Sequence, residues 1–444
     1  MLPPIAEYLQ NKTVLLVGFG REGQSSYRYI RRFFPEKEIA VADKNPVSVD
    51  DPHVVVFSGA DYLSHIPDFD VVLKSPGISF KDVRDAGRAE ITCQVDLFLR
   101  FAPCRKIGIT GSKGKTTTST LIHLCLQTAG KDSRLIGNIG VPVFEALEEV
   151  TENSIAVIEM SSHQLEFTHT SPEVAVITNL YEEHLEHYRG GFAGYARAKS
   201  HIALYQKAGD LLIYNADQGL DAFEGVAGTP AEKLGIRADD ALPFAIANEH
   251  LAGRHNRQDV LFARAAAKRF GVTDEQVERA VQSFAGIEHR MEKVGTFRGI
   301  TFYNDCIATI PHAVLCAVEA IGNVDTLIVG GMDRGISYAG FDRALAESGI
   351  RNIIGTPETG FAVVRAVQAL NPEKNAVTAA DLDEAVRLAY RYTAAGKSCL
   401  LSPAASSYNV YKNFEEKGRH FKLLVKQYAD KYGGHHEKNC SVFY

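Results

Sequence analysis

The sequence predicts an α/β protein built on parallel sheets, and three observations support that fold class. Short apolar and β-branched runs alternate along the chain with longer stretches of helical spacing, and such alternation is typical of parallel strands joined by helices. The alternation comes in three consecutive blocks, which suits a chain of 444 residues at roughly 150 residues per domain. Hydrophobic residues make up 45% and charged residues 23% of the chain, a balance typical of globular rather than disordered proteins.

The first block begins with a strand at 13–18 that ends in glycine, and its further predicted strands are 38–43, 54–57 and 71–77. The second block has predicted strands at 106–111, 154–160, 173–179 and 210–215. The third block has them at 325–331, 352–355 and 398–404. The segment 216–252 has little strand pattern, so we expect the central sheet to be trimmed there. The blocks predict three domains, at 1–100, 101–287 and 288–444.

Charge and hydropathy exclude several classes of protein. Lysine and arginine number 48 against 54 acidic residues, a net charge of −6, so no dedicated nucleic-acid binder is indicated. No apolar run reaches the roughly 18 residues of a membrane helix, and the N-terminus lacks the features of a secretory signal. The seven cysteines are scattered without a C-x-x-C pair. We therefore expect a cytoplasmic enzyme with no disulfide framework and no membrane insertion.

A glycine motif follows the first strand. Gly18, Gly20 and Gly23 fit the pattern G-x-G-x-x-G, and Asp43 ends the next predicted strand. This spacing is the dinucleotide fingerprint of a Rossmann-like domain, in which a ligand phosphate approaches the backbone at a helix N-terminus. A nicotinamide dinucleotide, a flavin or a nucleotide sugar would each fit, and so would a tight turn that holds no ligand.

A second glycine motif lies between the strand at 106–111 and a helical stretch. Residues 110–116 read TGSKGKT, which predicts a phosphate loop whose backbone N–H groups surround phosphate oxygens. Lys115 would neutralise the β- and γ-phosphates, and the Thr116 hydroxyl could bind Mg²⁺. The general pattern G-x4-G-K-[ST] requires glycine where this chain has Ile109, so the loop is a variant of that pattern.

The variant T-G-x-x-G-K-[ST] resembles the ATP loop of the Mur ligase family, whose members join amino acids to peptidoglycan precursors. Further segments are similar to motifs of that family: 137–140 (GNIG), 159–166 (EMSSHQLE), 178–185 (TNLYEEHL), Lys199, 253–256 (GRHN), 402–404 (SPA) and 412–415 (KNFE). The combination is most similar to the members that add glutamate, and it covers nearly the whole chain.

This resemblance implies a fold and a reaction. The fold would comprise a Rossmann-like N-terminal domain for the UDP substrate, a P-loop ATPase-like central domain, and a Rossmann-like C-terminal domain for the amino acid. The reaction would be ATP-dependent amide formation between UDP-N-acetylmuramoyl-L-alanine and glutamate through an acyl-phosphate, in peptidoglycan biosynthesis. D-Glutamate is the expected acceptor. The cofactors would be ATP and Mg²⁺ at two sites, the partners only these small molecules, and the expected state is a monomer.

The resemblance also implies which residues bind ATP and metal. The catalytic residues would be Lys115, Glu159, His184 and Lys199, and the metal ligands would be Thr116, Glu159, His184 and Lys199. ATP would contact Gly111, Ser112, Lys113, Gly114, Lys115, Thr116, Thr117, Asn256, Arg290 and Asp305. In the family, the lysine at the position of Lys199 is carbamylated, which turns a cation into an anionic oxygen ligand. The residues around Lys199 alone predict an ordinary surface lysine on an amphipathic helix.

The UDP substrate is expected to contact residues of the first two domains. These are Gly20, Arg21, Glu22, Asp43, Gly77, Asn138, Ser161, Gln164 and His184. On this interpretation the first glycine motif holds a UDP group and no redox cofactor. A cap, a turn or a solvated surface remains the alternative for each polar residue, above all for Arg21 and Glu22.

The amino-acid site is expected to contain Thr309, Arg334, Ser407 and Phe414. The chain departs from the family here, because Ile307 replaces a lysine near the incoming glutamate and Arg334 replaces a second lysine. Isoleucine cannot pair with a carboxylate, and arginine offers a bidentate fork in place of a point charge. L-Glutamate or another amino acid therefore stays open as the acceptor.

Two functions of other classes remain as alternatives. The motif at 18–23 would also suit a dinucleotide-dependent oxidoreductase, although that function leaves the phosphate loop unexplained. A nucleotide-binding regulator without catalysis would explain the loop, but it would have no use for the predicted metal ligands.

Overall fold

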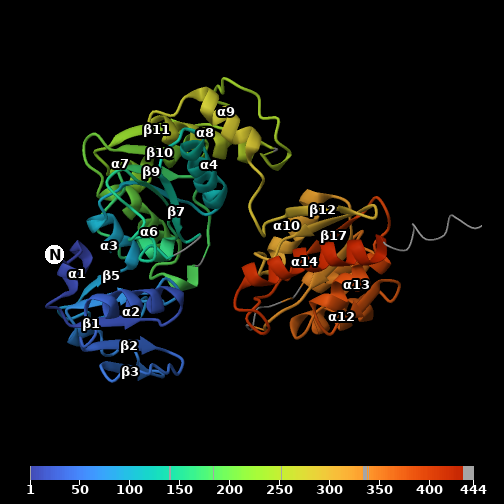
Figure 1. Cartoon of the computed structure of the whole chain (residues 1–444), viewed down its shortest axis with the longest axis horizontal. Coiled ribbons are helices and arrows are strands. Elements are labelled where there is room, and N and C mark those ends of the chain that lie inside the picture. Colours follow the sequence, from blue (N-terminus) through green and yellow to red (C-terminus); the bar gives the residue numbers. More distant parts are fainter. Residues whose placement is uncertain are drawn as a thin grey trace, which may run out of the picture. The chain divides into compact units, whose positions relative to one another are not determined.

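The computed structural model of the chain describes residues 2–139, 142–183, 185–251, 253–333, 338 and 340–433. Strands and helices alternate along it (Figure 1), and the strands form three sheets in chain order. The predicted α/β class is confirmed. No helix in the described part of the chain is long and apolar enough to cross a membrane.

The N-terminal sheet is entirely parallel. Its strands, in spatial order, are β3 (Val54–Ser58), β2 (Ile39–Asp43), β1 (Val14–Val17), β4 (Val71–Lys74) and β5 (Glu90–Thr92). Its helices are α1 (Pro4–Leu9), α2 (Arg21–Phe33), the short η1 (Ile66–Asp68) and α3 (Gln94–Phe101). The chain order reverses between β1 and β4, and ligands of such sheets bind in the crevice at the carboxyl ends of the strands at that point.

The central sheet is also parallel, with the spatial order β11 (Glu232–Ile236), β10 (Leu211–Asn215), β9 (Val174–Ile177), β6 (Arg105–Thr110), β8 (Ile155–Glu159) and β7 (Ser133–Gly137). Its helices are α4 (Lys115–Thr128), α5 (Ser162–Leu165), α6 (Phe192–Leu204), α7 (Glu224–Ala227), α8 (Arg254–Lys268) and α9 (Asp274–Ser283). Short 3-10 turns are η2 (Leu185–His187), η3 (Ala216–Gln218), η4 (Leu220–Ala222) and η5 (Glu249–Leu251). The segment 216–252 thus adds one peripheral strand, β11, that the sequence pattern did not indicate.

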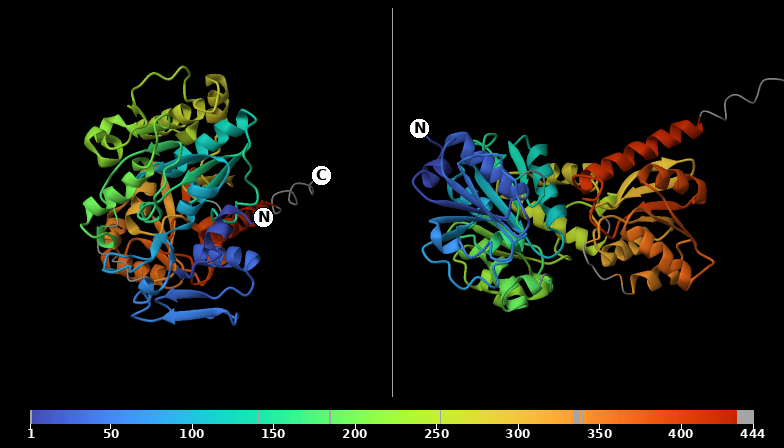
Figure 2. Two further views of the ribbon diagram at one scale, coloured as in Figure 1. Left: turned by 90° about the vertical axis from the view of Figure 1, so that its left-hand side faces the viewer. Right: turned by 90° about the horizontal axis from the view of Figure 1, so that it is seen from below.

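The C-terminal sheet has the order β12 (Glu292–Phe297), β13 (Ile300–Asn304), β17 (Ser398–Leu401), β14 (Val324–Val329), β15 (Asn352–Gly355) and β16 (Asn375–Thr378), with only β12 antiparallel. Its helices are α10 (Pro311–Ile321), α11 (Phe341–Glu347), α12 (Thr359–Leu370), α13 (Leu382–Tyr392) and α14 (Phe414–Gly433). Ile328 of β14 packs in one core cluster with α13 and α14, whereas Leu327 and Val329 pack in another with α10, α11 and α12. The right-hand view of Figure 2 shows α14, in red, along one side of this sheet. Successive side chains along each strand therefore point to opposite faces of the sheet and pack in two separate cores.

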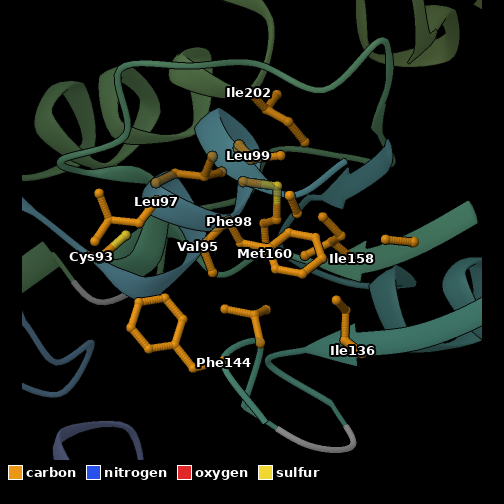
Figure 3. Close-up of a cluster of buried hydrophobic side chains, with 14 of the residues drawn as sticks. Cys93, Val95, Leu97, Phe98, Leu99, Ile136, Phe144, Ile158, Met160 and Ile202 are labelled. Atoms are coloured by element: carbon orange, nitrogen blue, oxygen red, sulfur yellow. The ribbon is translucent and has the colours of Figure 1, made fainter. Parts of the chain in front are cut away.

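The contacts divide the chain into two compact units, one from the N-terminus to Ala285 and one from Gly286 onward. The first unit contains two sheets because helix α3 joins them. Figure 3 shows Val95 and Phe98 of α3 among Ile158, Met160 and other side chains of the central sheet region. The same cluster includes Leu16 of the N-terminal sheet. The three-domain division at 1–100, 101–287 and 288–444 stays a prediction.

Candidate functional site

The phosphate loop occupies residues 110–114, between strand β6 and helix α4. Gly111 and Gly114 have φ angles of +150° and +81°, which favour glycine over any other residue. Helix α4 begins at Lys115, so the N–H groups of its first turn lack partners within the helix. Loop and helix terminus together form a site for phosphate oxygens.

The loop is held from two directions. After strand β9, the Asn179 Oδ1 accepts a hydrogen bond from the Lys113 N–H at 2.7 Å. From helix α8, the Asp259 Oδ1 accepts one from the Thr118 hydroxyl at 3.0 Å. The same oxygen would lie 2.6 Å from a Cβ on Gly114. Glycine is therefore required there by both its φ angle and its neighbour, and the loop conformation is fixed before any ligand binds.

Lys199, on helix α6, points into the phosphate loop. Only 1% of its surface is exposed, and its Nζ donates to the Gly111 carbonyl at 2.8 Å and to Thr110 Oγ1 at 3.3 Å. The Lys115 Nζ donates to the same Gly111 carbonyl at 2.8 Å. Burial, reinforced by the charge of Lys115, lowers the pKa of Lys199 well below that of an ordinary lysine. The expectation of a surface lysine is wrong, because the helix packs this face onto the loop.

Glu159 ends strand β8, beside the phosphate loop strand β6. The side chain is 2% exposed, and its Oε1 accepts a hydrogen bond from Asn138 Nδ2 at 2.7 Å. Its Oε2 is buried and has no hydrogen-bond partner in the described part of the chain. A buried carboxylate oxygen without a donor is costly unless a cation or water meets it. Glu159 thus fits the predicted Mg²⁺ ligand, since Mg²⁺ prefers such oxygens.

The other predicted ATP and metal residues lie in different places. Asn256 is in the first turn of α8, one turn before the Asp259 that touches the loop. His184, predicted as a catalytic residue, metal ligand and substrate contact, lies outside the described residues, as does Arg334.

Arg290 and Asp305 belong to the second unit. The Asp305 carboxylate accepts hydrogen bonds from the Met291 N–H at 3.1 Å and from the Ser402 hydroxyl at 2.8 Å. Burial raises the pKa of Asp305 to about 6, although these bonds and the nearby Arg290 charge oppose the rise. The two predicted ATP contacts therefore lie near each other at the end of β13.

The first glycine motif forms a tight turn between β1 and α2. Gly18 has a φ angle of +85°, and a Cβ on Gly23 would lie 2.0 Å from the Gly18 carbonyl oxygen. A Cβ on Gly20 would meet nothing within 4 Å. The Asp43 carboxylate accepts a hydrogen bond from the Phe19 N–H at 2.8 Å. Two glycines are thus required by the turn itself, whereas Gly20 faces open space that a ligand could fill.

The predicted substrate residues meet where the first two sheets join. The Gln164 Nε2, at the end of α5, donates to Glu22 Oε1 at 2.8 Å. Ser161 caps this short helix, and its Oγ accepts from the Gln164 N–H at 3.2 Å. Burial raises the pKa of Glu22 to about 7, against the opposing effect of the Gln164 bond. Arg21 stands beside Glu22 at the start of α2, and Gly77 follows strand β4, so the structure brings this group to the crevice between β1 and β4.

A second set of contacts joins the N-terminal sheet region to the central one. We call it the carbonyl latch, formed by residues 79–83 and 186–189. The Ser79 hydroxyl donates to the His187 carbonyl at 2.7 Å, and Lys81 Nζ donates to the Glu186 carbonyl at 2.9 Å. In return the Arg189 guanidinium donates to the carbonyls of Lys81 and Val83, at 2.9 and 3.0 Å from Nη2. The latch therefore anchors the chain just after the predicted His184.

The described residues of the predicted amino-acid site surround the end of β13 and the start of α14. Ser407 is buried, and its Oγ has no hydrogen-bond partner in the described part of the chain. The Phe414 ring packs edge-on against His289, with ring centroids 5.9 Å apart. Thr309 lies in the loop between β13 and α10, two residues after Ile307.

Several residues near these sites escaped the sequence interpretation. Asp259 shapes the phosphate loop, and the Tyr195 hydroxyl lies 2.7 Å from Ser112 Oγ, which also accepts from the Tyr181 N–H at 2.8 Å. Lys417 is a fully buried lysine of α14 whose Nζ donates to the Gly330 carbonyl at 2.8 Å. None of them has a sequence signal, because each contact joins residues far apart along the chain.

Comparison with known proteins gives the class of protein that this fold and site define. Residues 109–258 match the Mur ligase middle domain, and residues 289–405 match the Mur ligase glutamate ligase domain. Solved structures with a similar fold include UDP-N-acetylmuramate-alanine ligase of Thermotoga maritima, with a TM-score of 0.56 and 18% identity over 95% of this chain and 100% of that one. MurF of Acinetobacter baumannii gives a TM-score of 0.59 and 18% identity over 91% of this chain and 88% of that one.

The chain belongs to the Mur ligase family. Its curated relatives are named UDP-N-acetylmuramoylalanine–D-glutamate ligase. The relative from Symbiobacterium thermophilum is 35% identical over 84% of this chain and 87% of its own length. The relative from Pelodictyon phaeoclathratiforme is 33% identical over 94% of this chain and 99% of its own length.

Proposed function

We propose that this chain is an ATP-dependent, amide-forming ligase that adds D-glutamate to UDP-N-acetylmuramoyl-L-alanine in peptidoglycan biosynthesis. The observation that carries the proposal is the phosphate loop itself, on which Lys115 and Lys199 converge at the Gly111 carbonyl. The names of the curated relatives supply the two substrates. A MurF ligase of Thermotoga maritima that shares the fold was solved in complex with ADP, which supports ATP as the nucleotide.

The reaction needs two transfers. A carboxylate oxygen of the UDP substrate attacks the γ-phosphorus of ATP, and ADP leaves. The amine of glutamate then attacks the acyl carbon, and phosphate leaves while the amine loses a proton. Phosphoryl transfer asks the protein chiefly for positioning and charge neutralisation. The backbone N–H groups of residues 114–117 and the Lys115 ammonium would meet these needs.

Thr116 and Glu159 would hold Mg²⁺, with His184 at a second site. The role of Glu159 as a metal ligand is supported by its buried Oε2, which has no hydrogen-bond partner in the described part of the chain. When bound, Mg²⁺ neutralises phosphate charge and fixes the orientation of the phosphates. We further propose that Lys199 is carbamylated. Burial lowers the pKa of Lys199 and so favours its neutral amine. A neutral amine can add to CO₂ and release a proton, which gives an anionic carbamate able to bind metal.

The remaining site residues are assigned to the UDP substrate, to ATP or to the amino acid. Gly20, Glu22, Asp43, Gly77, Ser161 and Gln164 would bind the UDP substrate, together with Arg21, Asn138 and His184. Asn256, Arg290 and Asp305 would contact ATP. Thr309, Arg334, Ser407 and Phe414 would contact the amino acid. A cytoplasmic location, a monomeric state and the domain limits 1–100, 101–287 and 288–444 complete the proposal.

The decisive experiment measures phosphate release from MgATP and UDP-N-acetylmuramoyl-L-alanine with a panel of D- and L-amino acids. Release with D-glutamate above all others is expected. L-Glutamate is the informative comparison, because Ile307 and Arg334 stand where the family has lysines. A chain that binds ATP but releases no phosphate with any acceptor would contradict the proposal.

A further inference from the structure

Lys417 is an unusual lysine in the second unit. It is 4% exposed, and within the described part of the chain its Nζ makes a single hydrogen bond, to the Gly330 carbonyl at 2.8 Å. An ammonium has three donors, and a buried charge is expensive unless it is paired. Two donors and the charge are therefore left for another group.

The ammonium borders a pocket of about 170 Å³ at the carboxyl ends of β14, β15 and β16. Its lining includes Gly331, Thr356, Asp381, Asn409 and Tyr411 together with Lys417. Drug-sized ligands occupy about 300 to 1,000 Å³, so this pocket suits a side chain rather than a nucleotide. Asp381 is the one acid among these residues, and its carboxylate is engaged as the cap of α13, accepting from the Glu384 N–H at 2.8 Å.

The pocket adjoins the predicted amino-acid site. The turn at 330–331 that receives the Lys417 hydrogen bond continues to Met332, whose N–H donates to the Ser406 carbonyl at 2.8 Å. Ser406 precedes Ser407, whose buried hydroxyl lacks a partner. Burial raises the pKa of the Cys306 thiol, and the nearby Lys417 charge opposes that rise. Lys417 therefore hydrogen-bonds the turn that pairs with Ser406, and it lies near Cys306, the residue before Ile307.

We propose that this pocket binds the side-chain carboxylate of the incoming amino acid, with the Lys417 ammonium as its counter-charge. The proposal rests on the proposed function and names the group that makes the acceptor acidic. Lys417 would supply the positive charge that the chain lacks at Ile307. Since a lysine and a carboxylate form a charge-assisted pair in a water-poor pocket, this contact would select an acidic side chain over its amide.

The test compares D-glutamate with D-glutamine, which has the same shape without the charge. Lys417→Gln keeps a donor for the Gly330 carbonyl but removes the charge. We expect the ratio of kcat/KM for D-glutamate over D-glutamine to fall by about tenfold or more, since hydrogen bonds to charged groups contribute about 1.5–3 kcal/mol. KM for ATP should stay unchanged, and Lys417→Arg should retain much of the preference.

The matched control is Lys426→Met, an exposed lysine on the same helix, which should leave the ratio unaltered. A folded Lys417→Gln variant with the wild-type ratio would overturn the pocket assignment while the ligase activity stands. Wild-type protein that releases no phosphate with any amino acid would instead overturn the proposed function on which the pocket rests. Thermal unfolding of each variant identifies loss of folding. If Lys417→Gln does not fold, the uncharged Lys417→Met carries the comparison, with the same expected fall in the ratio.

Discussion

At the scale of single residues, burial decides what a lysine does. Lys199 and Lys417 have almost no exposed surface, and burial lowers the pKa of both. Neither has a carboxylate within ion-pair distance among the described residues. Each instead donates to a glycine carbonyl in a loop where a strand ends.

Lys199→Ala should abolish ligase activity, because it removes the amine that forms the carbamate beside the phosphate loop. Added short carboxylates such as acetate should restore part of the activity, since they can occupy the vacated volume and offer oxygen ligands. Phosphate release measures both effects. Lys207→Ala, at an exposed lysine beyond the same helix, is the control, and wild-type turnover by Lys199→Ala would refute the carbamate.

Glu22 should make the protein less stable as the pH rises. Burial raises the pKa of Glu22 in the folded chain to about 7, above the 4.5 of an ordinary glutamate, so the folded state binds more protons than the unfolded state between these two values. Stability is therefore lost as the pH rises from about 4.5 to about 7 and is level above that. Glu22→Gln should remove this part of the pH dependence and raise stability at pH 8 by about 2 kcal/mol. Urea unfolding at pH 5 and pH 8 measures the difference, and an equal slope in both proteins would contradict it.

The sequence indicated most of these residues only through motifs. The pattern TGSKGKT is sufficient to predict a phosphate loop, because strand, glycines and helix lie within a few residues of one another. The burial of Lys199 was not predictable in that way, since its partners Thr110 and Gly111 lie far back in the chain. The burial of Lys417 was not predictable for the same reason, since its partner Gly330 also lies far back in the chain.

At the scale of elements, five of the six strands at the edges of the described sheets escaped the sequence pattern. They are β5, β7, β11, β12 and β16, each with only one neighbouring strand. The interior strands are buried on both faces and read as continuous apolar runs, such as VLLV in β1 and VAVI in β9. An edge strand is partly exposed, as the mixed burial of β12 shows, so its sequence carries no comparable run.

The turn between β1 and α2 separates two roles of glycine. Gly23→Ala should destabilise the first unit by about 2 kcal/mol or more, because its Cβ would lie 2.0 Å from the Gly18 carbonyl oxygen. Gly20→Ala is the matched control for stability, since nothing lies within 4 Å of its Cβ. Gly20→Ala should nevertheless raise KM for the UDP substrate if a phosphate approaches that backbone. Thermal unfolding and substrate kinetics of the pair test both statements, and equal stability of the two variants would refute the first.

At the scale of the whole molecule, the chain divides at Ala285 and Gly286 into two units with separate cores. The length of the chain had suggested three domains, and three sheets are present. Chain length and strand pattern do not predict which domains pack against each other through a shared core. The first two sheets share the cluster around Phe98 and Met160 (Figure 3), which only the folded chain brings together.

A fragment of residues 1–285 should therefore fold alone, whereas a fragment of residues 1–100 should not, because the latter exposes the apolar face of α3. We expect two transitions for the full chain in scanning calorimetry, and the longer fragment should unfold cooperatively at one of them. The shorter fragment should aggregate or lack a transition. A stable 1–100 fragment, or a single transition of the full chain that the 1–285 fragment does not reproduce, would contradict this division.

The carbonyl latch has a consequence for the evolution of this enzyme. Every acceptor in it is a main-chain oxygen, of Lys81, Val83, Glu186 or His187. Replacing a side chain leaves such an acceptor in place, so the receiving positions can drift in sequence without loosening the latch. The latch itself constrains only the donor side chains of Ser79, Lys81 and Arg189. Orthologues should therefore retain a donor at 79, 81 and 189, whereas the latch makes no demand on the side chains at 83, 186 and 187.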